Sequence, residues 1–140
     1  MFRRLSAARA QVHLWDAFTG ACRGAYVGRD HLDELAVAYS VAFSPSGSRL
    51  FCGGDRSVRV FDTARCGVDC AVRPTAPTRR SSSGVKGLIG AVVCADDHVY
   101  AVGSYAGAVA VYDQGRKGII QRSFNVGVLV AMSERNASTL

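Results

Sequence analysis

Three residues with the chemistry of an acid–base or metal site lie close together in the sequence. His31, Asp33 and Glu34 could transfer protons or bind a metal ion, because imidazole and carboxylate groups do both. No nucleophile accompanies them, and one His with two carboxylates is a weak basis for catalysis. The pattern favours a loop-structuring role, in which Asp33 or Glu34 accepts backbone N–H groups, with partner contact as the alternative. We therefore expect no enzyme activity.

Basic side chains outnumber acidic ones and could bind nucleic acid. Seventeen Lys and Arg against eleven Asp and Glu give a formal net charge of +6 and a pI near 9.4. Arg side chains can contact RNA phosphates or stack on unpaired bases. The candidate RNA contacts surround one apolar segment and the polar stretch after it: Arg56, Arg65, Arg73, Arg79, Arg80 and Lys86. The alternative is a set of solvated charges. Arg59 lies inside an expected strand and should contact a neighbouring unit or an acid instead.

The five cysteines do not form a recognisable metal or disulfide pattern. Their number is odd, and no pair has the C-x2-C spacing of a zinc site. Free thiols, in a reducing compartment, are the expectation. The residues concerned are Cys22, Cys52, Cys66, Cys70 and Cys94. The sequence thus predicts no metal and no cofactor.

An internal repeat indicates which elements position these side chains. The alternating segment 12–16 recurs at 58–62 and 109–113, and each copy ends in an aromatic residue followed by Asp. The aromatic positions are Trp15, Phe61 and Tyr112, and the same spacing of about fifty residues relates Gly53 to Gly103. A period held over two strands and a turn predicts repeated supersecondary units.

Each unit reads as four short strands joined by tight turns. Candidate fourth strands are 22–27, 70–73 and 119–124. A four-stranded antiparallel sheet with two apolar faces buries both only when sheets stack radially, and the aromatic residue then fills the space between neighbours. The repeat-structure residues are Trp15, Asp16, His31, Asp55, Phe61, Asp62, Tyr112 and Asp113.

The length of 140 residues gives about three such units, whereas propellers close with roughly four to eight. We therefore expect an all-β fragment of a β-propeller, made of about three four-stranded antiparallel blade units, that is not closed. The predicted organisation is a basic, disordered lead-in over 1–11, a partial propeller over 12–124 with a mobile loop at 74–86, and an unassigned tail over 125–140. No apolar run is long enough for a membrane helix.

These units resemble WD40 repeats, since Trp15 and Asp16 form the dipeptide that gives those repeats their name. Less common runs in series are similar to the telomerase Cajal body protein family of WD40 proteins. These runs are 15–20, 31–35, 51–53, 58–61, 63–70 and 103–105, and the resemblance covers roughly 12–121. The chain is expected to be a partial member.

The resemblance implies a nuclear RNA-binding scaffold, located in Cajal bodies, that is not an enzyme. Its implied ligands are small RNAs with the Cajal-body box, of the H/ACA and C/D classes, and telomerase RNA. Its implied partners are H/ACA ribonucleoprotein proteins such as dyskerin and, indirectly, the telomerase catalytic subunit, with no membrane. The alternatives are a generic WD40 protein-interaction platform without RNA specificity and a non-functional truncated product.

The chain departs from the WD40 pattern in its hydrogen-bonded loop set. Many WD40 units join their loops through His, Ser or Thr, Asp and Trp. Here His31 and Asp55 could take part, but Gly54 lacks a hydroxyl and Phe61 lacks the indole donor. The third unit has Ser104 but no Asp between it and Tyr112. We expect these units to be stabilised by packing more than by that network.

Overall fold

The computed structural model describes residues 11–75, 84–113 and 120–125, the last of these through its backbone. The C-terminal tail beyond residue 125 and nearly all of the basic lead-in lie outside the described residues. So does the part of the 74–86 loop that contains Arg79 and Arg80.

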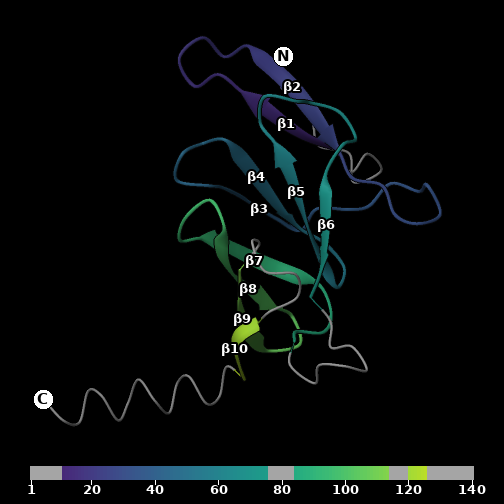
Figure 1. Ribbon diagram of the computed structural model, residues 1–140. Coiled ribbons are helices and arrows are strands. Elements are labelled where there is room, and N and C mark those ends of the chain that lie inside the picture. Colours follow the sequence, from purple (N-terminus) through teal and green to yellow (C-terminus); the bar gives the residue numbers. More distant parts are fainter. Residues whose placement is uncertain (1–10, 76–83, 114–119, 126–140) are drawn as a thin grey trace, which may run out of the picture.

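The described residues form strands arranged in three antiparallel sheets (Figure 1). The strands are β1 (Gln11–Trp15), β2 (Cys22–Val27), β3 (Ser40–Phe43), β4 (Arg49–Gly53), β5 (Ser57–Asp62), β6 (Ala71–Pro74), β7 (Ile89–Cys94), β8 (Val99–Ser104), β9 (Ala108–Asp113) and β10 (Ile120–Asn125). The first sheet is the hairpin β1–β2; the second has the order β3-β4-β5-β6, and the third the order β10-β9-β8-β7. The all-β fold is confirmed, and no described sheet closes into a barrel.

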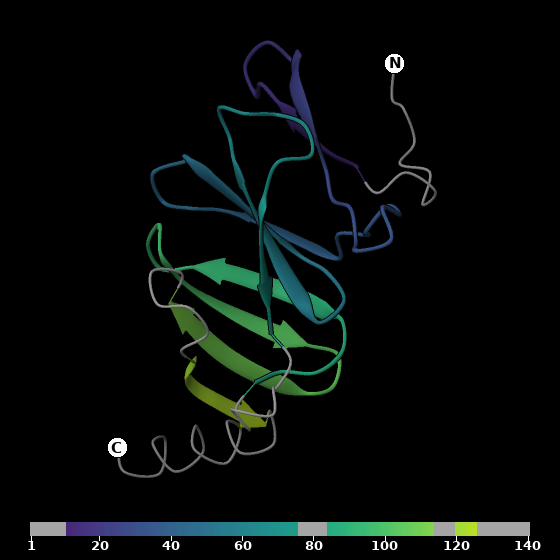
Figure 2. The ribbon, with the colours of Figure 1, turned by 45° about the vertical axis from the view of Figure 1, so that its right-hand side comes forward.

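The second sheet lies between the other two (Figures 1 and 2). Its side chains alternate along each strand, as the pleat requires. In β5, Val58 and Val60 pack against the third sheet, whereas Phe61 packs against the first. In β4, Phe51 packs against the third sheet and Leu50 packs against the first. Burial on both faces explains why these two strands read as almost continuous apolar runs.

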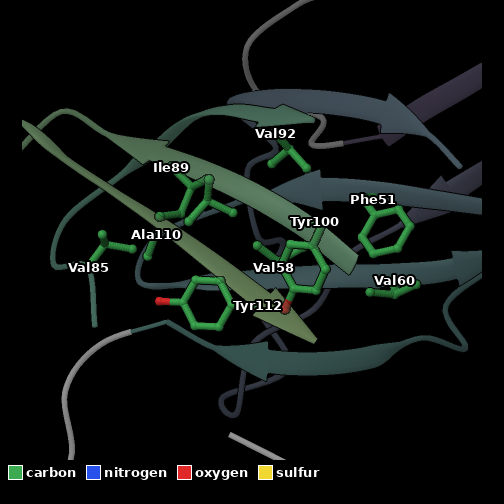
Figure 3. Close-up of a cluster of buried hydrophobic side chains, with 10 residues drawn as sticks. Phe51, Val58, Val60, Val85, Ile89, Val92, Tyr100, Ala110 and Tyr112 are labelled. Atoms are coloured by element: carbon green, nitrogen blue, oxygen red, sulfur yellow. The ribbon is translucent and has the colours of Figure 1, made fainter. Parts of the chain in front are cut away.

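Two apolar clusters join the sheets. The larger one, between the second and third sheets, comprises Phe51, Val58, Val60, Val85, Ile89, Val92, Tyr100, Val102, Ala110 and Tyr112 (Figure 3). Within it, Phe51 and Tyr100 have ring centroids 5.1 Å apart, and Tyr100 stacks on Tyr112 at 5.5 Å. The smaller cluster, between the first and second sheets, comprises Tyr26, Leu50, Cys52 and Phe61. Packing between sheets is therefore the main source of stability in the described part.

The aromatic residue near the end of each third strand faces the preceding sheet. Tyr112 is buried against the second sheet, with 5 % of its surface exposed. Phe61 is buried against the first sheet, with 2 % of its surface exposed. Both fill the space between neighbouring units, as the repeat predicts. Trp15 occupies the equivalent position in β1, but the described residues contain no sheet in front of it, and 58 % of its surface is exposed.

The Asp of the aromatic–Asp pair closes the turn into the fourth strand. The Asp16 carboxylate accepts the N–H groups of Phe18 at 2.9 Å and Thr19 at 3.1 Å, and it pairs with Arg23. Asp62 accepts the N–H of Ala64 at 2.9 Å in the corresponding turn. Short Asp side chains capture backbone donors two or three residues later, which fixes such turns.

Asp16 should make stability depend on pH in the acidic range. The Arg23 hydrogen bond, followed by the Thr19 and Phe18 N–H groups, lowers the pKa of Asp16 from 3.8 to about 2. A folded-state pKa below the unfolded value gives stability that is complete above pH 4 and is lost as pH falls towards 2. In Asp16→Asn, which keeps the backbone hydrogen bonds, the denaturant midpoint should fall less steeply between pH 4 and 2. The exposed Asp69→Asn serves as control, and equal slopes for Asp16→Asn and wild type would refute the assignment.

Candidate functional site

The connections between strands gather at two opposite ends of the sheets. End A contains residues 29–39 of the β2–β3 connection, called the connection 29–39 below, the β4–β5 turn 54–56 and the described parts of the connection 75–88. Backbone hydrogen bonds from Tyr39 to Gly53 and from Arg56 to Gly87 hold these segments together. End B contains the turns 16–21, 44–48, 63–70 and 95–98.

Two of the predicted RNA-contact residues lie together at end A. The Arg56 N–H donates to the Gly87 carbonyl at 3.0 Å, next to Lys86, and the Arg56 carbonyl accepts the N–H of Thr75 at 3.0 Å. Thr75 and Gly84 border the segment that contains Arg79 and Arg80, which lies outside the described residues. Both side chains, Arg56 and Lys86, are exposed.

The structure separates Arg65 and Arg73 from this pair. Arg65 is exposed in the β5–β6 turn at end B, the opposite end of the second sheet. Arg73 is half-buried in β6, and its register partner Val58 belongs to the cluster facing the third sheet. Its Nε is buried without a partner among the described residues. Burial raises the pKa of Tyr100 to about 12, and the nearby Arg73 charge opposes that rise. Arg73 thus faces the interface between sheets.

Arg59 lies between the first and second sheets, as expected for a residue that contacts a neighbouring unit. It is 8 % exposed, and its guanidinium donates to the Arg29 carbonyl at 3.1 Å and the Ser57 hydroxyl at 3.5 Å. A Cβ on Gly28 would lie only 3.0 Å from its Cδ. No ion pair joins Arg59 to an acid among the described residues, and its Nε has no partner there.

We expect Arg59 to contribute through packing of its stem more than through its charge. A buried cation without an ion pair recovers little of its desolvation cost. Arg59→Met, which keeps an unbranched side chain, should change the free energy of unfolding by less than about 1 kcal/mol. Arg59→Ala should lower it by about 2–3 kcal/mol through lost packing. Equal losses for the two variants in denaturant unfolding would show instead that the charge matters.

The charge of the described side chains has the opposite sign to that of the whole chain. They include eight of the seventeen Lys and Arg residues but ten of the eleven Asp and Glu residues, which is a formal charge of −2. The excess of positive charge therefore belongs to residues whose side chains are not described. Attraction of RNA to the described sheets would depend on local groups of Arg and Lys, not on their total charge.

The connection 29–39 is structured by Asp30, so the prediction that Asp33 or Glu34 accepts the backbone donors is wrong. Asp30 Oδ1 accepts the N–H groups of Leu32 at 2.8 Å and Glu34 at 3.0 Å, and these bonds lower the pKa of Asp30. An Asp at the first position of such a turn reaches the donors that follow it. Asp33 has a φ of 61° and pairs with Arg29 at 3.7 Å.

The polar network of many WD40 units is not assembled in the described part of this chain. His31 is exposed, and Asp55 pairs with Arg56 at 3.4 Å rather than with that histidine. The Ser104 hydroxyl is buried without a described partner. Within the described ranges, no three His, Cys, Asp or Glu side chains are grouped to hold a metal, and no helix could span a membrane.

The cysteines are free thiols, as predicted. Cys52 is buried in the smaller cluster, and burial raises its pKa to about 12. A thiol with so high a pKa is an apolar packing group at neutral pH, because the reactive thiolate is absent. Burial also raises the pKa of Cys70 and of Cys94.

Comparison with known proteins agrees with this geometry. The WD40 family model (WD domain, G-beta repeat) matches residues 26–62, which begin within β2 and end with β5. Telomerase Cajal body protein 1 from Bos taurus and from Homo sapiens is 46 % identical over 101 residues, 72 % of this chain and 18 % of each relative. The chain is homologous to one part of telomerase Cajal body protein 1. A homologue from Drosophila melanogaster is 44 % identical over 59 residues, 42 % of this chain and 11 % of that relative.

This chain thus spans less than one fifth of the length of the curated mammalian relatives above. Similarity over 101 residues exceeds the 37 residues of a single matched repeat, so the similarity extends across more than one of the repeated units.

Proposed function

We propose that this chain is a WD40 scaffold segment that helps bind Cajal-body-box small RNAs and telomerase RNA and helps direct ribonucleoproteins, including telomerase, to Cajal bodies and telomeres in the nucleus. The observation that carries the proposal is the 46 % identity to Telomerase Cajal body protein 1 over 72 % of the chain. The partners proposed with it are H/ACA proteins such as dyskerin and, indirectly, the telomerase catalytic subunit. The proposal includes no enzyme activity and no cofactor.

Within this proposal, RNA contact is assigned to end A. Arg56 and Lys86 lie there together, next to the described borders of the segment that contains Arg79 and Arg80. Exposed cations such as these could bind successive phosphates of a single strand. Arg65 lies at end B and Arg73 faces the third sheet, so neither is expected to contribute much affinity.

Crosslinking to RNA in cells, followed by sequencing of the recovered RNA, tests the proposal. Box-containing small RNAs should be enriched by the wild-type chain, and enrichment should fall several-fold in the double variant Arg56→Ala/Lys86→Ala. Arg65→Ala is the matched control, since it removes an exposed Arg from end B. Recovery of RNA at background level by the wild-type chain would overturn the proposal, and equal losses in both variants would overturn the assignment to end A.

A second function, protein interaction without RNA specificity, is favoured by a different observation. The connection 29–39 at end A exposes four large apolar side chains within eight residues of sequence, and exposed apolar surface of this kind can bind a partner protein. In this second function the WD40 repeats bind a partner protein. One chain can bind both a protein and RNA.

A further inference from the structure

We infer that the connection 29–39 is a docking site for a basic peptide segment of a partner protein that carries apolar side chains. The inference rests on the protein-interaction function proposed above and names the surface and the chemistry of its partner. It depends on three observations: the exposed apolar residues of the connection, the hydrogen bonds that order its backbone, and its negative charge.

The apolar surface is concentrated within eight residues. The large apolar side chains exposed there are Leu32 at 66 %, Leu35 at 39 %, Val37 at 44 % and Tyr39 at 44 %. They follow one another along the same connection and do not enter either apolar cluster. Burying such side chains against a partner gains free energy in proportion to the apolar area removed from water.

Hydrogen bonds within the connection and from Arg59 order its backbone. The Asp30 N–H donates to the Glu34 carbonyl at 2.9 Å, and the Ala36 N–H donates to the Gly28 carbonyl at 2.9 Å. The buried Arg59 guanidinium anchors its start through the Arg29 carbonyl. A preordered surface loses little conformational entropy when it binds, which favours affinity.

The charge around these apolar residues selects the partner. Residues 29–39 carry three acids and one Arg, a formal charge of −2, and although Asp33 pairs with Arg29, both Asp33 and Glu34 are exposed beside Leu32 and Leu35. Lys or Arg side chains of a partner would be attracted by this local excess of acid. The occupant that fits is a peptide in which basic and large apolar residues are interleaved.

Selection from a displayed library of random twelve-residue peptides, with the full chain as target, tests the inference. Peptides that combine Arg or Lys with Leu, Phe or similar residues should be enriched. Their affinity for Leu32→Ser/Glu34→Gln should be about tenfold lower than for wild type. These substitutions leave the Asp30 hydrogen bonds to the backbone in place.

The matched control carries the same kinds of change at end B. Phe18→Ser/Asp69→Asn replaces a fully exposed apolar residue and an exposed acid there. Affinity of the selected peptides for this variant should stay within about twofold of wild type. Failure to enrich peptides, enrichment of acidic ones, or equal losses in the two variants would overturn the docking site. Because the crosslinking experiment scores RNA, failure here with normal RNA recovery would leave the RNA proposal standing.

Discussion

Phe51→Ala should lower the free energy of unfolding by about 3–5 kcal/mol. Phe51 is 0 % exposed and lies in the larger cluster, 5.1 Å from the ring of Tyr100 (Figure 3). Truncation removes the ring from the contact between the second and third sheets and leaves a cavity that the rigid strands cannot close. Denaturant unfolding followed by tryptophan fluorescence and by circular dichroism would measure the loss.

Phe43→Ala is the matched control for that measurement. Phe43 lies in β3 of the same sheet but is 51 % exposed, so its truncation should cost about 1 kcal/mol or less. Similar losses for the two Phe variants would contradict the view that stability resides between the sheets.

Gly53→Ala should be strongly destabilising, whereas Gly103→Ala, at the equivalent repeat position, should be tolerated. A Cβ at Gly53 would lie 2.3 Å from the Ser40 hydroxyl and 2.7 Å from the Ile89 carbonyl oxygen. That serine hydroxyl donates to the same carbonyl at 2.9 Å, which joins the second sheet to the third. Among the described residues, a Cβ at Gly103 would meet only the Ala91 Cβ at 3.7 Å, an ordinary contact.

The expected loss for Gly53→Ala is about 2–3 kcal/mol, because the Ile89 carbonyl is backbone and can move only if the sheets separate. Gly103→Ala should lie within about 0.5 kcal/mol of wild type. Thermal melting of both variants, measured side by side, checks the difference. A tolerated Gly53→Ala would mean that the close approach of the two sheets at this residue is not required.

The strand order could be predicted from the sequence because the repeat constrains it strongly. Strands β5 and β9 end at the Asp that follows Phe61 and Tyr112, as the aromatic–Asp pattern indicates. The predicted fourth strand 22–27 coincides with β2. Alternation around buried positions, together with turn residues at fixed spacing, determines which residues pair. This pattern is local in the sequence, so the fold could be predicted without information on long-range contacts.

The functional surface was less predictable, since it depends on which ends of the strands meet. The sequence places Arg56, Arg65 and Arg73 within eighteen residues, but the hairpin turns send Arg65 to end B and the pleat turns Arg73 towards the third sheet. Asp30 rather than Asp33 structures the first connection, because its position in the turn decides which donors it reaches. The run of exposed apolar residues after Asp30 was visible in the sequence as a signal, but only their exposure in the structure distinguishes them from core.

The distribution of charge along the chain limits what its net charge says about RNA binding. The value of +6 favours nucleic acid for the chain as a whole, yet the described side chains carry more acids than bases. Specific RNA contact must therefore come from a local group of cations, such as the one proposed at end A, added to any general attraction.

The most direct test of the central claim compares the affinity of the chain for two RNA hairpins at the same salt concentration. One hairpin contains the Cajal-body box, and the other has the box mutated while length and base pairing stay the same. The proposed function predicts that the box-containing hairpin binds at least about tenfold more tightly, because unpaired bases are read individually. Equal affinity for the two hairpins would show that positive charge alone attracts RNA, and it would contradict the claim.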